Sequence, residues 1–146
     1  MKLVSKMLLG LGAVAAGIQL IRPTQTNPSI TAELQAPPEV SKLLHRACYD
    51  CHSNETRWPW YSQVAPVMWL VTRDVNEGRR ELNFSEFGRY EVARQKKKLQ
   101  KLVSEVEEGE MPMPIYPPLH PEAKLTGDER KKLTDWAKGL YDSLSQ

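Results

Sequence analysis

The order of apolar and polar residues divides the chain into one apolar stretch followed by four amphipathic ones. Residues 7–21 are apolar almost throughout, whereas from residue 39 onward apolar residues recur three and four positions apart, the spacing of one helix face. The four faces are formed by Val40, Leu43, Leu44 and Ala47, by Val67, Leu70, Val71 and Val75, by Leu99, Leu102, Val103 and Val106, and by Leu133, Trp136, Ala137 and Leu140. The pattern predicts an all-α fold, with a small helical domain preceded by an N-terminal apolar helix.

Glycines and a capping motif mark the ends of these helices. Gly78 is expected to end the second amphipathic helix and Gly109 the third, because glycine is favoured just beyond a helix C-terminus. Thr126 and Glu129 have the separation of a capping box, which predicts the start of the last helix. We expect the face of that helix that includes Trp136 to cross the first amphipathic helix.

The N-terminal apolar stretch predicts either a signal peptide or a retained signal anchor. Lys2 and Lys6 precede it, and its small-x-small motifs, such as Ala13-Val14-Ala15, lie inside the apolar run. We therefore favour a single-pass anchor in the cell membrane, with secretion into the periplasm after cleavage as the alternative. The two lysines favour a cytoplasmic N-terminus, which places the rest of the chain on the extracytoplasmic side.

The next segment carries Pro23, Pro28, Pro37 and Pro38, which disfavour helix and predict an extended, semi-rigid tether without chemistry of its own. The chain is therefore expected to have three parts. These are residues 1–22 as signal anchor or signal peptide, residues 23–38 as tether and residues 39–146 as the folded domain.

The composition limits the class of partner. With 146 residues, 40% hydrophobic and 26% charged, the chain suits one modest domain with appendages. A net charge of +2 gives no strong positive field, so we expect no nucleic-acid partner. The two cysteines, Cys48 and Cys51, belong to one motif and leave no structural disulfide.

That motif, Cys48-Tyr49-Asp50-Cys51-His52, matches the attachment signature of c-type haem. Each thiol adds across one vinyl group of the porphyrin, and a single helical turn between the cysteines lets both sulfurs reach neighbouring vinyls. His52, directly after the second cysteine, is then the proximal iron ligand. The motif predicts one covalent haem c held by Cys48, Cys51 and His52.

Two other interpretations of the cysteines are weaker. A zinc site needs about four ligands, but beyond the motif only His45 and His120 remain, and His45 is expected to be exposed on its helix. A thioredoxin-like dithiol is preceded by a strand, whereas residues 37–44 have the pattern of a helix start.

Residues 110–121 are rich in proline and are expected to form an ordered loop, because such a segment fits neither a helix nor a sheet interior. The loop contains Met111, Met113 and His120, each able to be the sixth iron ligand. We favour Met111, which leaves the preceding helix in an extended conformation ahead of proline. Met113 and His120 remain alternatives.

The aromatic run of Trp58, Trp60 and Tyr61 surrounds Pro59. It is expected to pack against the haem, with an indole N–H or the Arg57 guanidinium meeting a propionate, or else to form ordinary core and a turn.

Several segments together resemble a bacterial haem-binding domain family of small exported or membrane-anchored c-type proteins. The matching segments are residues 19–23, Asn27-Pro28 and residues 48–69, 74–79, 82–85, 108–112 and 119–126. The resemblance implies a cytochrome c-like domain with haem attached at Cys48 and Cys51 and ligated by His52. Met111 corresponds to the methionine of the family's Glu-Met-Pro segment, while Met113 departs from the family pattern.

These observations predict an electron carrier rather than an enzyme: a c-type cytochrome that exchanges single electrons with redox partner proteins and reaches the membrane through its N-terminal helix. The alternative is a haem-based sensor or a peroxidase-like ligand-binding domain. That alternative requires an open sixth position on the iron.

Overall fold

The computed structural model describes residues 2–144, and within this range the chain forms α-helices and 3-10 helices and no strand. In chain order the elements are α1 (Lys2–Gln19), α2 (Pro38–Ala47), α3 (Tyr49–His52), η1 (Trp60–Gln63), α4 (Val67–Glu81), η2 (Phe84–Arg89), α5 (Val92–Glu107), η3 (Pro121–Ala123) and α6 (Gly127–Ser143). The predicted all-α fold with an N-terminal apolar helix is confirmed. Residue 1 and residues 145–146, which belong to the predicted parts 1–22 and 39–146, lie outside the described residues.

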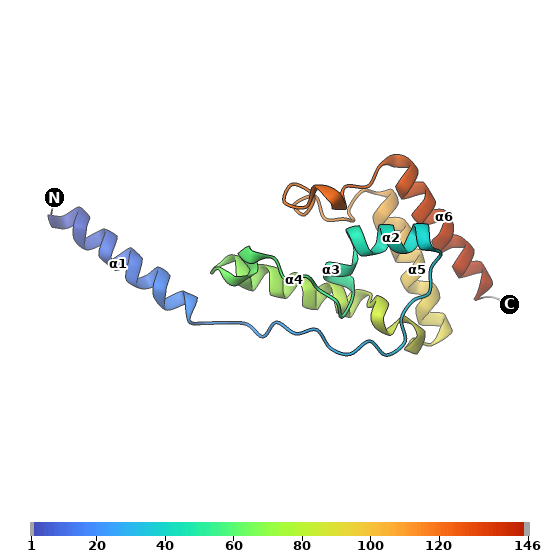
Figure 1. Cartoon of the computed structure of the whole chain (residues 1–146), viewed down its shortest axis with the longest axis horizontal. Helices are drawn as coiled ribbons and strands as arrows, with labels where there is room; N and C mark the ends of the chain where they lie inside the picture. The colour runs from blue at the N-terminus through green and yellow to red at the C-terminus, as the bar shows by residue number, and fades with distance from the viewer. Residues whose placement is uncertain (1, 145–146) are drawn as a thin grey trace.

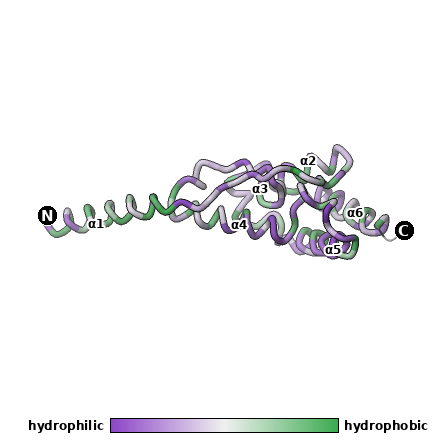
Figure 2. Tube along the Cα trace, turned by 90° about the horizontal axis from the view of Figure 1, so that it is seen from below, coloured by the Kyte–Doolittle hydropathy of each residue, from purple (hydrophilic) through white to green (hydrophobic). Residues whose placement is uncertain are grey.

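Helix α1 projects away from the other helices (Figure 1). None of its residues is buried, and apolar residues recur along its whole length (Figure 2). Its 18 residues extend over about 27 Å at the rise of an α-helix, close to the thickness of a bilayer's hydrocarbon core. Helix α1 is therefore long and apolar enough to cross a membrane, and a signal sequence would have the same properties.

The segment between α1 and α2 is extended and lies along the helical domain (Figure 1). The Leu34 amide donates to the Phe84 carbonyl at 2.8 Å, and the side chain of Leu34 is buried in the core. Arg79 in α4 donates to the Thr26 carbonyl and to the side chain of Asn27. The predicted tether is thus attached to the domain at several points between Gln25 and Leu34, and it does more than separate the domain from α1.

Helices α2, α5 and α6, together with η2, enclose the main core. Its largest fully buried side chains include Leu44, Phe84, Leu99 and Leu133. The predicted capping box opens α6, since Thr126 and Glu129 exchange both side chain–backbone hydrogen bonds. Helix α6 contacts α2 as expected, but its longest contact runs along α5, and the two helices lie side by side in Figure 1.

Candidate functional site

The Cys-x-x-Cys-His motif forms a single helical turn after a break in the chain. Helix α2 ends at Ala47, Cys48 adopts φ −129° and ψ −36°, and α3 begins at the next residue. The amides of Cys51 and His52 both donate to the Cys48 carbonyl, at 3.1 and 2.9 Å. Both thiols and the imidazole are therefore presented by one short turn, which is the arrangement that the spacing requires.

Two backbone carbonyls hold the ring of His52. Its Nδ1 lies 2.9 Å from the oxygen of Gly78 and 3.0 Å from the oxygen of Leu82. Because a carbonyl only accepts hydrogen bonds, Nδ1 carries the proton and Nε2 keeps its lone pair. Burial lowers the pKa of His52 against the opposing effect of the two carbonyls, so the ring stays neutral at physiological pH. A neutral imidazole with its second nitrogen fixed in this way is the form that ligates metals.

The contact between α3 and α4 depends on Gly78. The predicted helix end at this residue is wrong, since α4 continues to Glu81. A Cβ on Gly78 would lie 2.5 Å from the carbonyl oxygen of Cys51, far inside van der Waals contact. Glycine is therefore needed here for the close approach of α3 to α4 rather than for a turn. This approach lets the Gly78 carbonyl accept a hydrogen bond from His52 Nδ1.

A cavity of about 450 Å³ lies beside the motif. Its volume is typical of pockets for cofactors and other small molecules. Both cysteines and His52 line it, and most of the remaining wall is apolar, including Ala47, Leu82, Phe84, Leu102, Val106, Met111, Pro112 and Met113. Two thiols, a neutral imidazole and thioether sulfurs around an apolar hollow form a donor set that fits a haem.

The same geometry disfavours the two other interpretations of the cysteines. Within residues 2–144, the three metal-ligating side chains whose donor atoms converge within 4.8 Å of one another are Glu33, His45 and Glu55, not the motif. Burial raises the pKa of Cys48 to about 12 and that of Cys51 to about 11, whereas a redox-active dithiol has a lowered pKa. Cys48, Cys51 and His52 are arranged around a cavity rather than around one zinc ion.

Two of the three candidate sixth ligands reach this cavity. Met111 and Met113 both line it, and Met111 also packs against the core. The Met111 amide donates to the Glu105 carbonyl at 3.0 Å, which fastens the start of the loop to the last turns of α5.

His120, the third candidate, has partners elsewhere. Its Nε2 lies 2.7 Å from the hydroxyl oxygen of Tyr61, and its ring stacks on Tyr116 with 4.2 Å between centroids. His120 is not among the residues that line the cavity in the described part of the chain. The structure thus uses this histidine to join the loop to η1.

Asp50, between the two cysteines, connects the motif to the same loop. Its carboxylate accepts hydrogen bonds from the backbone N, Nε and Nη2 of Arg57 and from the Tyr116 hydroxyl at 2.7 Å. Burial by itself would raise the pKa of Asp50, but these hydrogen bonds outweigh burial and lower it. Tyr116 lines the cavity, so ionised Asp50 fixes one part of the wall to the motif.

The aromatic run lies to one side of the cavity. Trp60 is 79% exposed, Trp58 is half-buried, and Tyr61 is bonded to His120. None of the three belongs to the cavity wall formed by residues 2–144. Their packing against a haem stays a prediction.

Sequence reasoning missed Arg79, Asp50 and Tyr116. The Arg79 guanidinium donates to the Ser53 carbonyl at 2.7 Å and to the Thr56 hydroxyl at 2.8 Å, which ties α4 to the chain just beyond the motif. Periodicity marks Arg79 only as a polar position on a helix. Its partners lie between 23 and 53 residues away, so no local signal identifies them.

The family comparison agrees with this geometry. The family model described as "Haem-binding domain" matches residues 13–139, which include the motif, the cavity wall and the proline-rich loop. No curated protein and no solved structure matches the chain.

Proposed function

The chain belongs to the haem-binding domain family, and from this premise we propose that it is a c-type cytochrome with one covalent haem, which transfers single electrons on the outer side of a bacterial cytoplasmic membrane. The observation that carries the proposal is the state of His52. Both thiols of the motif line the cavity that the imidazole faces, and two carbonyls hold the ring in the tautomer that ligates iron.

Four side chains would hold the cofactor. The Cys48 and Cys51 thiols each add across one vinyl group, with the sulfur bonding to one vinyl carbon and the hydrogen passing to the other, so that no group leaves. His52 Nε2 and the Met111 thioether would be the two protein ligands of the iron. The haem would supply a reversible one-electron couple, and the identity of these two ligands would tune its potential.

Electron transfer is favoured over catalysis by the supply of ligands. Met111 and Met113 both line the cavity, so the protein can supply a sixth ligand to the iron from Met111 and has a second thioether, Met113, in the same wall. An iron with two protein ligands has no open position for a substrate. The alternative of a sensor or peroxidase-like domain would require both methionines to stay away from the iron, and it would make the protein a ligand-binding haem protein rather than a carrier.

The location follows from α1 and the residues around it. Lys2 and Lys6 lie near its start, which favours a cytoplasmic N-terminus and an extracytoplasmic domain. The favoured arrangement is a single-pass anchor, with redox proteins as partners. Cleavage of α1 as a signal peptide is the alternative, and N-terminal sequencing of the mature protein from both the membrane and the soluble fractions would decide between them. A mature terminus beyond Gly17 would exclude the anchor.

Covalent attachment is tested by expressing the full chain with a c-type maturation system and staining a denaturing gel for haem. We expect the stain to migrate with the wild-type polypeptide and to be lost from the Cys48→Ser/Cys51→Ser double variant. Stain that runs with the dye front in the wild type would contradict a c-type protein.

The electron-transfer role is tested on the same preparation by spectroscopy and potentiometry. We expect a low-spin spectrum with the weak far-red band of methionine–iron ligation, and no rapid spectral change when CO is added to the reduced protein. Rapid CO binding would instead favour the sensor or peroxidase-like alternative.

A further inference from the structure

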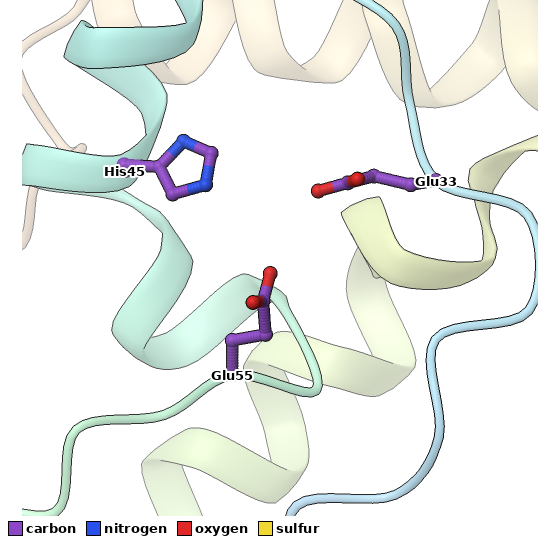
Figure 3. A group of neighbouring side chains, drawn as sticks. All are labelled: Glu33, His45 and Glu55. Atoms are coloured by element: carbon purple, nitrogen blue, oxygen red, sulfur yellow. The ribbon is translucent and has the colours of Figure 1, made fainter.

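Three side chains from separate segments converge on the surface away from the cavity. Glu33 comes from the extended segment before α2, His45 from α2 and Glu55 from the chain after α3. Their donor atoms lie within 4.8 Å of one another, and Figure 3 shows the three side chains directed into a common space. We propose that Glu33, His45 and Glu55 bind a divalent first-row transition metal ion of the zinc type, at a second site independent of the haem.

The ring of His45 is prepared for ligation by its own helix. Its Nδ1 lies 2.9 Å from the Ser41 carbonyl oxygen, which can only accept, so Nδ1 carries the proton and Nε2 keeps its lone pair. The ring also stacks on Tyr49, with 3.7 Å between centroids and 22° between planes. In metal sites, the histidine nitrogen that does not bind the metal is usually hydrogen-bonded, and this bond orients the ring. His45 has such a bond at Nδ1, while its Nε2 faces the two carboxylates.

Glu33 is fixed by the same tyrosine. The Tyr49 hydroxyl donates to Glu33 Oε1 at 3.0 Å. Burial, and to a smaller extent this hydrogen bond, raise the pKa of Tyr49, so the hydroxyl keeps its proton and remains a donor. Tyr49 therefore holds both His45 and Glu33, one through its ring and the other through its oxygen. A carboxylate that accepts a hydrogen bond on one oxygen still has a second oxygen for a metal.

The two carboxylates lack a charge partner in the described structure. Within residues 2–144 neither Glu33 nor Glu55 pairs with a lysine or an arginine, whereas Glu81, Glu107 and Glu129 all do. Like charges held close together are unfavourable unless a proton or a cation lies between them. A divalent cation between Glu33 and Glu55 removes that repulsion.

One nitrogen and two carboxylate donors select the type of ion. Calcium and magnesium are bound by oxygen alone, and sites for softer ions use thiolates, whereas zinc accepts His with Asp or Glu and completes a tetrahedron with water. Ligands ~2.1 Å from a tetrahedral ion lie ~3.4 Å from one another, so donor atoms up to 4.8 Å apart must approach by up to about 1.4 Å. Glu55 is exposed and has room to make most of that movement.

The site would join three parts of the chain. The ion ties the extended segment at Glu33 to α2 and to the chain just beyond His52. Because only the folded chain brings these ligands together, bound zinc stabilises the fold and raises its melting temperature. It would also hold the segment leading from α1 against the domain.

The test is calorimetric titration of ZnCl2 into the full-length, tag-free holoprotein in detergent after treatment with a chelator. We expect one zinc per chain, a rise in Tm with added zinc, and no response to MgCl2. His45→Phe keeps the ring stacked on Tyr49 but removes the ligand, and it should weaken zinc binding by about tenfold or more. Glu55→Gln should also weaken zinc binding.

The matched control is Glu39→Gln, which neutralises an exposed carboxylate on the same helix outside the cluster. It should bind zinc like the wild type. Equal affinity of wild type and His45→Phe, or no zinc bound by the wild type, would overturn the proposal. If His45→Phe loses its haem spectrum, Glu55→Gln decides, since the side chain of Glu55 is exposed and supports no core contact. The readout is zinc binding, so either result leaves the haem proposal unaffected.

Discussion

His52 lies on a helical turn held by two carbonyls from the end of α4, whereas Met111 and Met113 lie in a proline-rich loop beyond α5. Both regions line one cavity. The His52 ring is held by two hydrogen bonds, and α4 packs so closely on the motif that a methyl group on Gly78 would collide with the Cys51 carbonyl. The loop instead presents two thioethers two residues apart, and both of them line the cavity.

The difference shows two ways of supplying a ligand. One ligand is fixed by hydrogen bonds and close packing, so its surroundings tolerate little change. The other ligand, Met111, lies in a segment whose prolines limit its conformations. Met113, two residues further on, has the same thioether group. The predictions below test that contrast, beginning with the largest expected effect.

Replacement of Gly78 by alanine should disrupt the packing of the Cys-x-x-Cys-His turn on α4. The new Cβ must push the Cys51 carbonyl away, and overpacking of this kind typically costs about 1–3 kcal/mol, with the upper end expected because the obstacle is backbone. We expect lower stability in urea unfolding and reduced haem retention after maturation. Gly139→Ala in α6, where a Cβ meets nothing within 4 Å, is the control and should stabilise the protein by about 0.5–1 kcal/mol. Equal stability and equal haem retention in Gly78→Ala and Gly139→Ala would show that the close approach of Gly78 to the Cys51 carbonyl is not needed.

Met111→Ala should change the iron rather than the fold. We expect loss of the far-red methionine band and a reduction potential lower by on the order of 0.1 V, since axial ligands set the potential over a wide range. Met113→Ala should keep both band and potential. Retention of the band in each single variant, with loss in the double variant, would mean that the two methionines replace each other freely.

Asp50→Asn should weaken the link between the two regions. It removes charge-assisted hydrogen bonds to Arg57 and Tyr116, and we expect a loss of about 1–2 kcal/mol in unfolding free energy near neutral pH. Because the pKa of Asp50 is lowered in the fold, its contribution is present above the ordinary value of 3.8 and is lost as the pH falls through the folded value.

The difference between wild type and Asp50→Asn should therefore narrow below about pH 4 in denaturant titrations at a series of pH values. Asp142→Asn, at an exposed position of α6, serves as the control and should follow the wild type throughout. A constant difference across the acidic range would exclude the charge of Asp50 as the cause.

His120→Ala should have the smallest effect on the iron. It removes the hydrogen bond to Tyr61 and the stacking on Tyr116, for a loss of about 1 kcal/mol, while the methionine band and the potential stay unchanged. Tyr61→Phe breaks the same hydrogen bond but keeps the stacking of His120 on Tyr116, so it should destabilise the protein less than His120→Ala. Loss of low-spin ligation in His120→Ala alone would make the site bis-histidine and the assignment of Met111 wrong.

The features that could be predicted from the sequence are those that depend on neighbours along the chain. Apolar spacing identified the long helices, Thr126 and Glu129 announced the start of α6, and the Cys-x-x-Cys-His motif together with the family resemblance indicated haem. The helix spacing, the capping box and the motif each rest on interactions within about one helical turn, where residues close in the sequence are also close in space.

Contacts between groups far apart in the sequence became visible only in the folded chain. The partners of His52, Arg79 and Asp50 lie on other elements, so spacing could not identify them, and Gly78 was mistaken for a helix end because its obstacle is the carbonyl of Cys51 on another helix. The cluster of Glu33, His45 and Glu55 was equally hidden, since the segment carrying Glu33 was expected to be a plain tether. A backbone carbonyl carries no mark in the sequence, and a hydrogen bond or close contact to one appears only when packing brings the two segments together.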